Sequence, residues 1–215
     1  MNTRSLLFRS LHRTFATANF ANKVLIETHE LEQLMKEQPE NVSIFNASYP
    51  TATIRPRENH ISKRIPQSVF FDFDEFSQKG SKFSYTVPSE ESFAQNMKKL
   101  DVRKSDIVVV YDKVGMLSSP RAYWLLKTFG LPNVLLLNGT FSKWDGEKRP
   151  TMENDSECAW MRLNRKSLPQ ADDFNFSFDK RKILNFDDII ATTATKKSGG
   201  EKMPIIDSRF EQAFN

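Results

Sequence analysis

Short apolar runs alternate along this chain with segments in which apolar residues recur at helical spacing. The apolar runs predict strands within residues 23–28, 42–47, 69–71, 106–111 and 133–137. The helical spacing predicts helices within residues 29–38, 87–100 and 119–129. Because strands that alternate with helices form βαβ units, the pattern predicts an α/β fold, a parallel sheet with helices on both faces.

The segment DIVVVY at 106–111 is almost uniformly apolar, as expected for a central parallel strand that is covered on both faces. The next helix carries clear boundary signals, because Ser119 is a predicted N-cap, Pro120 a first helical residue and Gly130 a residue just past the end. Ligands in α/β proteins bind outside the carboxyl ends of the strands. The junction between this strand and this helix is therefore where functional residues are expected.

The positive charge of the chain is concentrated at its N-terminus. The formal net charge is +4, and residues 1–22 contain arginines but no acidic residue. An amphipathic, Arg-rich, acid-free segment is typical of a mitochondrial presequence, so we expect a location in the matrix or in a matrix-facing membrane complex. The alternative is a basic surface helix of the mature protein. The remainder is close to neutral, which argues against a nucleic-acid partner, and no apolar run reaches the roughly 18 residues of a transmembrane helix.

Residues that commonly carry chemistry are few. The chain has 7 glycines, too few to favour a nucleotide-binding glycine loop, and its single cysteine, Cys158, excludes an internal disulfide. The three histidines, His12, His29 and His60, lie far apart in the sequence. We therefore expect no metal site and no cofactor.

A second pattern indicates an internal repeat. ILNFDDI at 183–189 matches LIETHEL at 25–31, and IIDS at 205–208 matches IFNA at 44–47. We interpret the later pair as the first strand, helix and second strand of a duplicated domain. The predicted segments are a presequence, an α/β domain, a polar linker and an incomplete second repeat, at residues 1–22, 23–150, 151–181 and 182–215.

Two further clusters have structural interpretations. Residues 48–64 are predicted to be an irregular loop. This loop holds a cluster of basic residues that we interpret as a solvated or interdomain surface: Arg55, Arg57, His60, Lys63 and Arg64. In DFNFSFDK at 173–180, three phenylalanines alternate along the chain: Phe174, Phe176 and Phe178. Such a segment is typical of an edge strand or a docking segment whose apolar side needs a partner.

Four motifs occur in order along the body of the chain. They are RIPQSVFFDFDEF (64–76), VPSEESFAQNMKKLDV (87–102), DIVVVYDKVGMLSSPRAYWLLKTFG (106–130) and NVLLLNGTFSKW (133–144). Together they resemble the N-terminal domain of the tandem rhodanese-like sulfurtransferases, the thiosulfate and 3-mercaptopyruvate sulfurtransferases. Three positions depart from the family pattern, because Arg64 replaces the usual histidine, and Gln67 and Thr140 replace glycines.

The resemblance implies a cysteine mechanism. A thiolate after the central strand, cradled by backbone N–H groups and a helix N-terminus, takes sulfane sulfur as a persulfide. Here the nucleophile position is Asp112, and a carboxylate cannot hold a persulfide sulfur. The first domain of the tandem enzymes is also inactive, commonly with Asp at this position. We interpret the site as a degenerate active-site-like loop whose N–H groups bind the Asp112 carboxylate, with members Asp112, Lys113, Val114, Gly115, Met116 and Leu117.

No other residue is expected to replace the missing nucleophile. Cys158 lies in the predicted linker, follows no strand and lacks a helix N-terminus that would stabilise a thiolate. The family's substrate-binding arginine in the second repeat corresponds to Ala213, a degenerate position. Arg121 is interpreted as a packing residue in the first turn of its helix.

Three functional hypotheses follow. The first is a catalytically inactive mitochondrial protein, a structural or interaction subunit whose partners are other proteins of a multi-subunit complex. The second is the N-terminal part of an active sulfurtransferase that forms its Cys persulfide in a missing second domain. The third is a non-catalytic module that binds a small anion or a sulfur carrier. The absence of a nucleophile favours the first, and no sulfur transfer is expected of the chain as given.

Overall fold

The computed structural model describes residues 20, 22–51, 55–103, 105–154, 176–197 and 204–206. The chain divides into two units, of which the first ends at Phe178 and the second begins at Asp179. Almost all of the predicted presequence at 1–22 lies outside the described residues, and the predicted linker at 151–181 is described only at its two ends.

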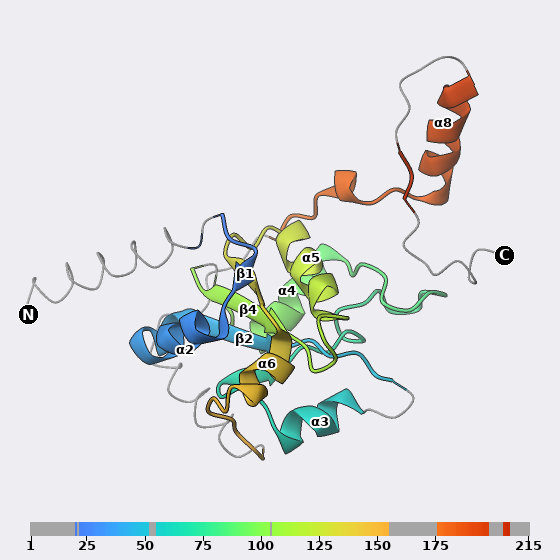
Figure 1. Cartoon of the computed structure of the whole chain (residues 1–215). Helices are drawn as coiled ribbons and strands as arrows, with labels where there is room; N and C mark the ends of the chain where they lie inside the picture. Colours follow the sequence, from blue (N-terminus) through green and yellow to red (C-terminus); the bar gives the residue numbers. More distant parts are fainter. Residues whose placement is uncertain are drawn as a thin grey trace, which may run out of the picture. The chain divides into compact units, whose positions relative to one another are not determined.

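The first unit is built on a parallel sheet (Figure 1). Its five strands are β1 (Leu25–Ile26), β2 (Val42–Asn46), β3 (Ser68–Phe70), β4 (Ile107–Tyr111) and β5 (Val134–Leu137). The strand order is β1-β5-β4-β2-β3, and every neighbouring pair is parallel. All residues of β4 are buried, which confirms the predicted central strand.

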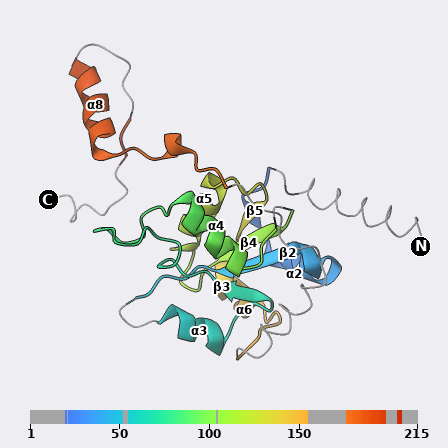
Figure 2. The same ribbon diagram turned by 180° about the vertical axis from the view of Figure 1, so that it is seen from behind.

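Helices cover both faces of this sheet, because successive side chains of a strand point to opposite faces. Val108 and Val110 of β4 join one apolar cluster, which α4 (Glu90–Lys99) and α5 (Ser119–Thr128) complete. Ile107, Val109 and Tyr111 face the other cluster, which α2 (Thr28–Glu37) and α6 (Thr140–Gly146) complete (Figures 1 and 2). The predicted α/β fold with two covered faces is confirmed.

The segment after β2 differs from the predicted irregular loop. A short helix, α3 (Pro56–Ser62), forms there with proline in its first turn, and a 3-10 turn, η1 (Pro39–Asn41), precedes β2. The sequence of α3, PRENHIS, lacks an apolar stripe, and His60 is the buried residue of this helix. Helical periodicity could not predict α3 because a polar contact, described below, fixes this helix to the sheet.

The start of α5 also differs from the prediction by one residue. The helix begins at Ser119, and Ser118 rather than Ser119 occupies the N-cap position. The side chain of Ser118 makes no capping hydrogen bond to this helix. Gly130 follows the helix with a φ of +89°, so its predicted role just past the end is confirmed.

The phenylalanine segment packs onto the first unit. Phe176 is buried, and its ring centre lies 4.9 Å from that of Phe93 in α4. The ring of Phe178 lies 5.2 Å from that of Phe129, and its N–H donates to Glu90 Oε1 at 2.7 Å. This confirms the docking interpretation for these two residues, whereas Phe174 lies outside the described residues.

The second unit contains a 3-10 turn, η2 (Lys180–Lys182), and a helix, α8 (Phe186–Lys197). The helix stands where the repeat predicts one. The predicted strands are not formed within the described residues, because 183–185 and 204–206 are irregular. A strand needs a neighbour to satisfy its backbone hydrogen bonds, and no ladder is present in the described part of this unit. No described helix has the length and apolarity that crossing a membrane demands.

Candidate functional site

The loop from Asp112 to Ser118 joins the end of β4 to the start of α5. The chain leaves β2 toward β3 on one side of the sheet, whereas it leaves β4 toward β5 on the other. The loops after β4 and β2 therefore flank the point where the order of connections reverses. Open α/β sheets form their binding crevices at this point.

The Asp112 carboxylate fills the inside of this loop. It is fully buried, and its Oδ1 accepts the N–H groups of Val114 at 3.1 Å and Met116 at 2.9 Å. Its Oδ2 accepts the N–H groups of Ser118 and Ser119, each at 2.9 Å, and the Ser119 hydroxyl at 2.9 Å. The N–H groups at the start of α5 also favour negative charge at this end. Five donors therefore converge on one carboxylate.

Two residues in the left-handed region turn the loop around the carboxylate. Gly115 has a φ of +89° and Met116 a φ of +64°. The tip faces outward, because Val114 and Leu117 are exposed. The loop therefore has a closed polar interior and an apolar exterior.

A hydrogen-bonded chain connects this loop to α3. The N–H of Lys113 donates to Ser48 Oγ at 3.1 Å, and that hydroxyl donates to Asn46 Oδ1 at 2.6 Å. Asn46 Nδ2 lies 3.1 Å from His60 Nδ1. Burial, followed by the positive charges of Arg64 and Lys113, lowers the pKa of His60 to about 3. The neutral ring therefore accepts at Nδ1.

The interpretation of the charged cluster as a solvated or interdomain surface is wrong for His60 and Arg64, because both side chains are buried within the first unit. Arg64 donates to the carbonyl of Asn154 at 2.6 Å and forms an antiparallel bridge with Met152. A run of charged residues in sequence looks solvated, but backbone carbonyls can satisfy a buried guanidinium.

Lys113 reaches away from the inside of the loop. Its ammonium donates to the side-chain oxygen of Asn59 at 2.6 Å and to the carbonyls of Asn59 and Lys63. It also lies 4.9 Å from the centre of the Phe141 ring. Burial, followed by the positive charges of Arg64 and Lys63, lowers the pKa of the Lys113 ammonium to about 8. This side chain therefore ties the loop to α3 and leaves the carboxylate to the backbone.

This chain is similar in sequence to known proteins. The family model of the rhodanese-like domain matches residues 28–147. The chain belongs to the rhodanese-like family. This rhodanese-like chain is 37% identical over 126 residues to the thiosulfate sulfurtransferase TUM1 of Saccharomyces cerevisiae, a match that covers 59% of this chain and 40% of the relative. It is 30% identical to the thiosulfate sulfurtransferase of Gallus gallus, over 77% of this chain and 53% of that protein.

A solved structure of the family agrees with the fold. SseA of Escherichia coli, a 3-mercaptopyruvate sulfurtransferase, superposes with a TM-score of 0.74 at 25% identity. The match covers 90% of this chain and 68% of that one. The chain spans about half the length of the curated relatives it matches.

The rhodanese-like loop has a limited chemical repertoire in the described residues. Its interior holds a carboxylate, which is acceptor-only when ionised and has no thiolate chemistry. Cys158 and Ala213 both lie outside the described residues. No group of three or more histidine, cysteine, aspartate or glutamate side chains that could hold a metal ion occurs in the part of the chain that is described.

The Arg121 side chain packs against neighbouring residues of the first unit. Its guanidinium donates to the carbonyl of Tyr85 and lies 4.8 Å from the centre of the Trp124 ring. The sequence predicted the loop but not the roles of Asn46, Ser48 and His60, which connect it to α3. Their spacing carries no motif, because the contacts cross between the ends of different elements.

Proposed function

We propose that this rhodanese-like domain transfers no sulfur itself and acts as a structural or interaction subunit of a larger mitochondrial assembly. The observation that carries the proposal is the Asp112 carboxylate, which accepts five hydrogen bonds inside the loop. In this proposal, Asp112 occupies the nucleophile position of the family. The degenerate loop continues through Lys113, Val114, Gly115, Met116 and Leu117.

An occupied loop is poorly suited to bind an anionic sulfur donor. The donors that would stabilise a second anion already bind Asp112, and the buried negative charge would repel it. Displacing the carboxylate would require its transfer to water and the loss of its five hydrogen bonds. The loop therefore works as an internal anchor for α5, and the exposed outer face remains for contacts with other proteins.

The segment assignment is part of the proposal. Residues 23–150 form the rhodanese-like domain, 151–181 the linker and 182–215 an incomplete second repeat with Ala213 at the position of the substrate arginine. The family match at 28–147 supports the first of these, and α8 supports the last. The predicted presequence at 1–22 supports the mitochondrial location, and a relative in Arabidopsis thaliana carries the word mitochondrial in its name.

A second candidate function has its own observation. The chain matches about half of the length of sulfurtransferases that bear thiosulfate or 3-mercaptopyruvate in their names. This favours the view that the domain is the non-catalytic part of an active enzyme. In that case Asp112 has the same anchoring role, and a cysteine in another domain would take the sulfur.

The first experiment tests whether the chain carries sulfane sulfur. The purified chain is incubated with thiosulfate, alkylated and examined by mass spectrometry for a persulfide. A thiolate that attacks the outer sulfur of thiosulfate forms the persulfide and releases sulfite, so sulfite gives a second readout. We expect neither product, and Cys158→Ser serves as the control without any thiol. A persulfide on Cys158 with sulfite release would overturn the non-catalytic proposal.

The second experiment separates the two candidates. Source mitochondria are resolved on a native gel, followed by a denaturing dimension probed for this chain. A band near 24.9 kDa or below, within a large assembly, supports the subunit. A band near twice that mass, free or dimeric, supports the sulfurtransferase and contradicts the subunit.

A further inference from the structure

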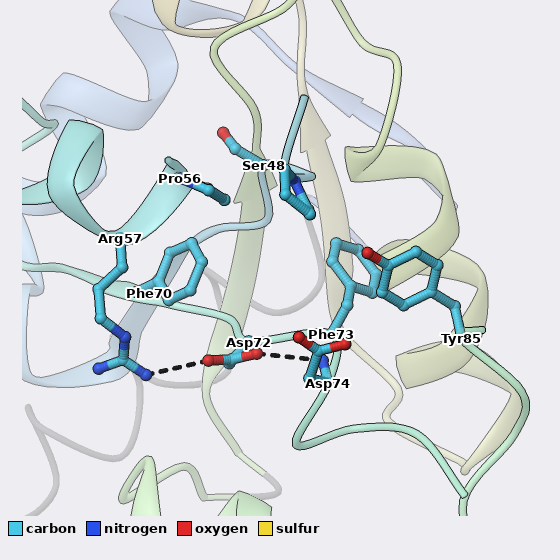
Figure 3. Close-up of a pocket in the computed structure, with 9 residues that line it drawn as sticks. Ser48, Pro56, Arg57, Phe70, Asp72, Phe73, Asp74 and Tyr85 are labelled. Atoms are coloured by element: carbon cyan, nitrogen blue, oxygen red, sulfur yellow. Dashed lines mark hydrogen bonds and ion pairs between the residues drawn. The ribbon is translucent and has the colours of Figure 1, made fainter. Parts of the chain in front are cut away.

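A small pocket lies at the carboxyl ends of β2 and β3, beside the filled loop. Its volume is about 160 Å³, and it is distinct from the loop interior because neither Asp112 nor any other loop residue lines it. Three of its lining residues are aromatic: Phe70, Phe73 and Tyr85. Figure 3 shows Phe70 on one side and Phe73 with Tyr85 on the other, while Asp72 and Asp74 lie at one end.

The charged residues of the pocket leave a negative balance. Arg57 Nη2 lies 3.0 Å from Asp72 Oδ2, and the N–H of Asp74 donates to Asp72 Oδ1 at 3.0 Å. The Asp74 carboxylate has no hydrogen-bond or ion-pair partner among the described residues. The pocket is therefore lined by one arginine and two aspartates, and the carboxylate of Asp74 is available to a ligand.

The aromatic residues of the pocket also favour a positively charged ligand. The face of an aromatic ring is electronegative and attracts a cation within about 6 Å of its centre. Phe70 already makes one such contact, because the guanidinium of Arg57 lies 5.4 Å from its ring centre. Burial raises the pKa of the Tyr85 hydroxyl, and the carboxylates of Asp74 and Asp72 raise it further, so their negative field reaches this wall.

The Ser48 hydroxyl offers little to an anion. Ser48 Oγ donates to Asn46 Oδ1 and accepts the N–H of Lys113, so its proton is already used. The geometry points to a receptor for an alkylammonium group, either a lysine side chain of a partner protein or a free primary amine. The ammonium would lie near Asp74 and the alkyl stem against the rings and the prolines Pro50 and Pro56. This inference holds whether or not the domain belongs to a sulfurtransferase.

The test is an NMR titration of the isotope-labelled full chain with three ligands of similar shape: butylammonium, butyrate and 1-butanol. We expect millimolar binding of butylammonium, with shift changes at residues around the pocket, and at least fivefold weaker binding of the other two. A short peptide with one lysine forms a further arm. Tighter binding of the peptide than of butylammonium assigns the pocket to a partner's lysine, and equal or weaker binding assigns it to a free amine.

Two variants locate the interaction. Asp74→Asn preserves the shape and removes the charge, so butylammonium binding should weaken about fivefold, and Phe70→Leu should weaken it about threefold. Glu37→Gln, an equal change of charge on α2, is the control and should leave binding unchanged. An unchanged melting temperature shows that each variant is folded. Butyrate or butanol binding as tightly as butylammonium, no butylammonium binding at millimolar concentration, or full binding by Asp74→Asn would each overturn the inference.

Discussion

Replacing Asp112 with alanine is the sharpest test of the loop. The substitution removes the acceptor of four N–H groups and one hydroxyl while it leaves the rest of the loop unchanged. These donors do not lose their bonds equally. The tip around Val114 is exposed, so water can replace the carboxylate there, whereas Ser118 and Ser119 are buried.

The magnitude follows from the buried donors. A buried donor left without a partner costs about 1–3 kcal/mol, and two N–H groups at the start of α5 fall in this class. Part of this loss is offset, because the variant has no carboxylate that must be removed from water on folding. We expect a net decrease of about 3 kcal/mol in the free energy of unfolding. For a chain of this size, that corresponds to a fall in melting temperature of about 6–12 °C.

Urea unfolding followed by circular dichroism measures this free energy. Asp112→Asn is the informative companion, because its amide places a new NH2 group against a cradle of donors and should recover less than half of the loss. Asp74→Asn is the matched control. Its carboxylate is exposed and makes no hydrogen bond in the described residues, so its stability should change by less than about 0.5 kcal/mol.

Anion addition provides a second readout. Sulfate should raise the melting temperature of Asp112→Ala more than that of the unsubstituted chain at equal ionic strength, because the emptied loop can bind it and the filled loop cannot. An unfolding free energy of Asp112→Ala within about 0.5 kcal/mol of the original would refute the anchoring role. Equal responses to sulfate would show that the donors do not form an anion site.

Three further predictions concern other parts of the fold. His60 has a pKa of about 3 in the folded chain and takes up its proton near pH 6.5 in the unfolded chain. The free energy of unfolding should therefore fall as the pH drops from about 6.5 to about 3. His60→Gln should flatten this slope in urea titrations at several pH values. Phe176→Ala should lower the free energy of unfolding by about 2–3 kcal/mol, whereas Ser177→Ala, at an exposed neighbour, should not; equal urea midpoints would contradict the docking. Gly130→Ala should cost about 1–2 kcal/mol, because its φ of +89° strains a Cβ although no atom lies within 4 Å; an unchanged thermal midpoint would disprove this strain.

The exposed apolar residues of the loop tip fit the interaction role that we propose. Val114 is 39% exposed and Leu117 is 63% exposed, on a loop whose interior is fixed by Asp112. A rigid backbone that presents apolar side chains loses little entropy when it binds a partner. The loop can therefore present these side chains without a change of shape.

The pattern of apolar residues determined the fold of the first unit to a large extent. The five predicted strand regions all overlap observed strands, and β4 is central because DIVVVY can be buried on both faces. The position of Asp112 after β4 was also predictable, since strand, loop and capped helix are all local signals. A local sequence pattern is enough where each element's own burial decides its structure.

Tertiary structure decided the surroundings of the loop. α3 has no apolar stripe, and it forms where His60 meets Asn46 from β2. The N-cap of α5 moves to Ser118 because Asp112, several residues earlier, accepts the N–H groups that would otherwise need a local cap. The residues that line the pocket come from the ends of β2 and β3, from the start of α3 and from the loop before α4. Contacts between residues distant in the chain depend on which strands become neighbours, and no local pattern encodes that order.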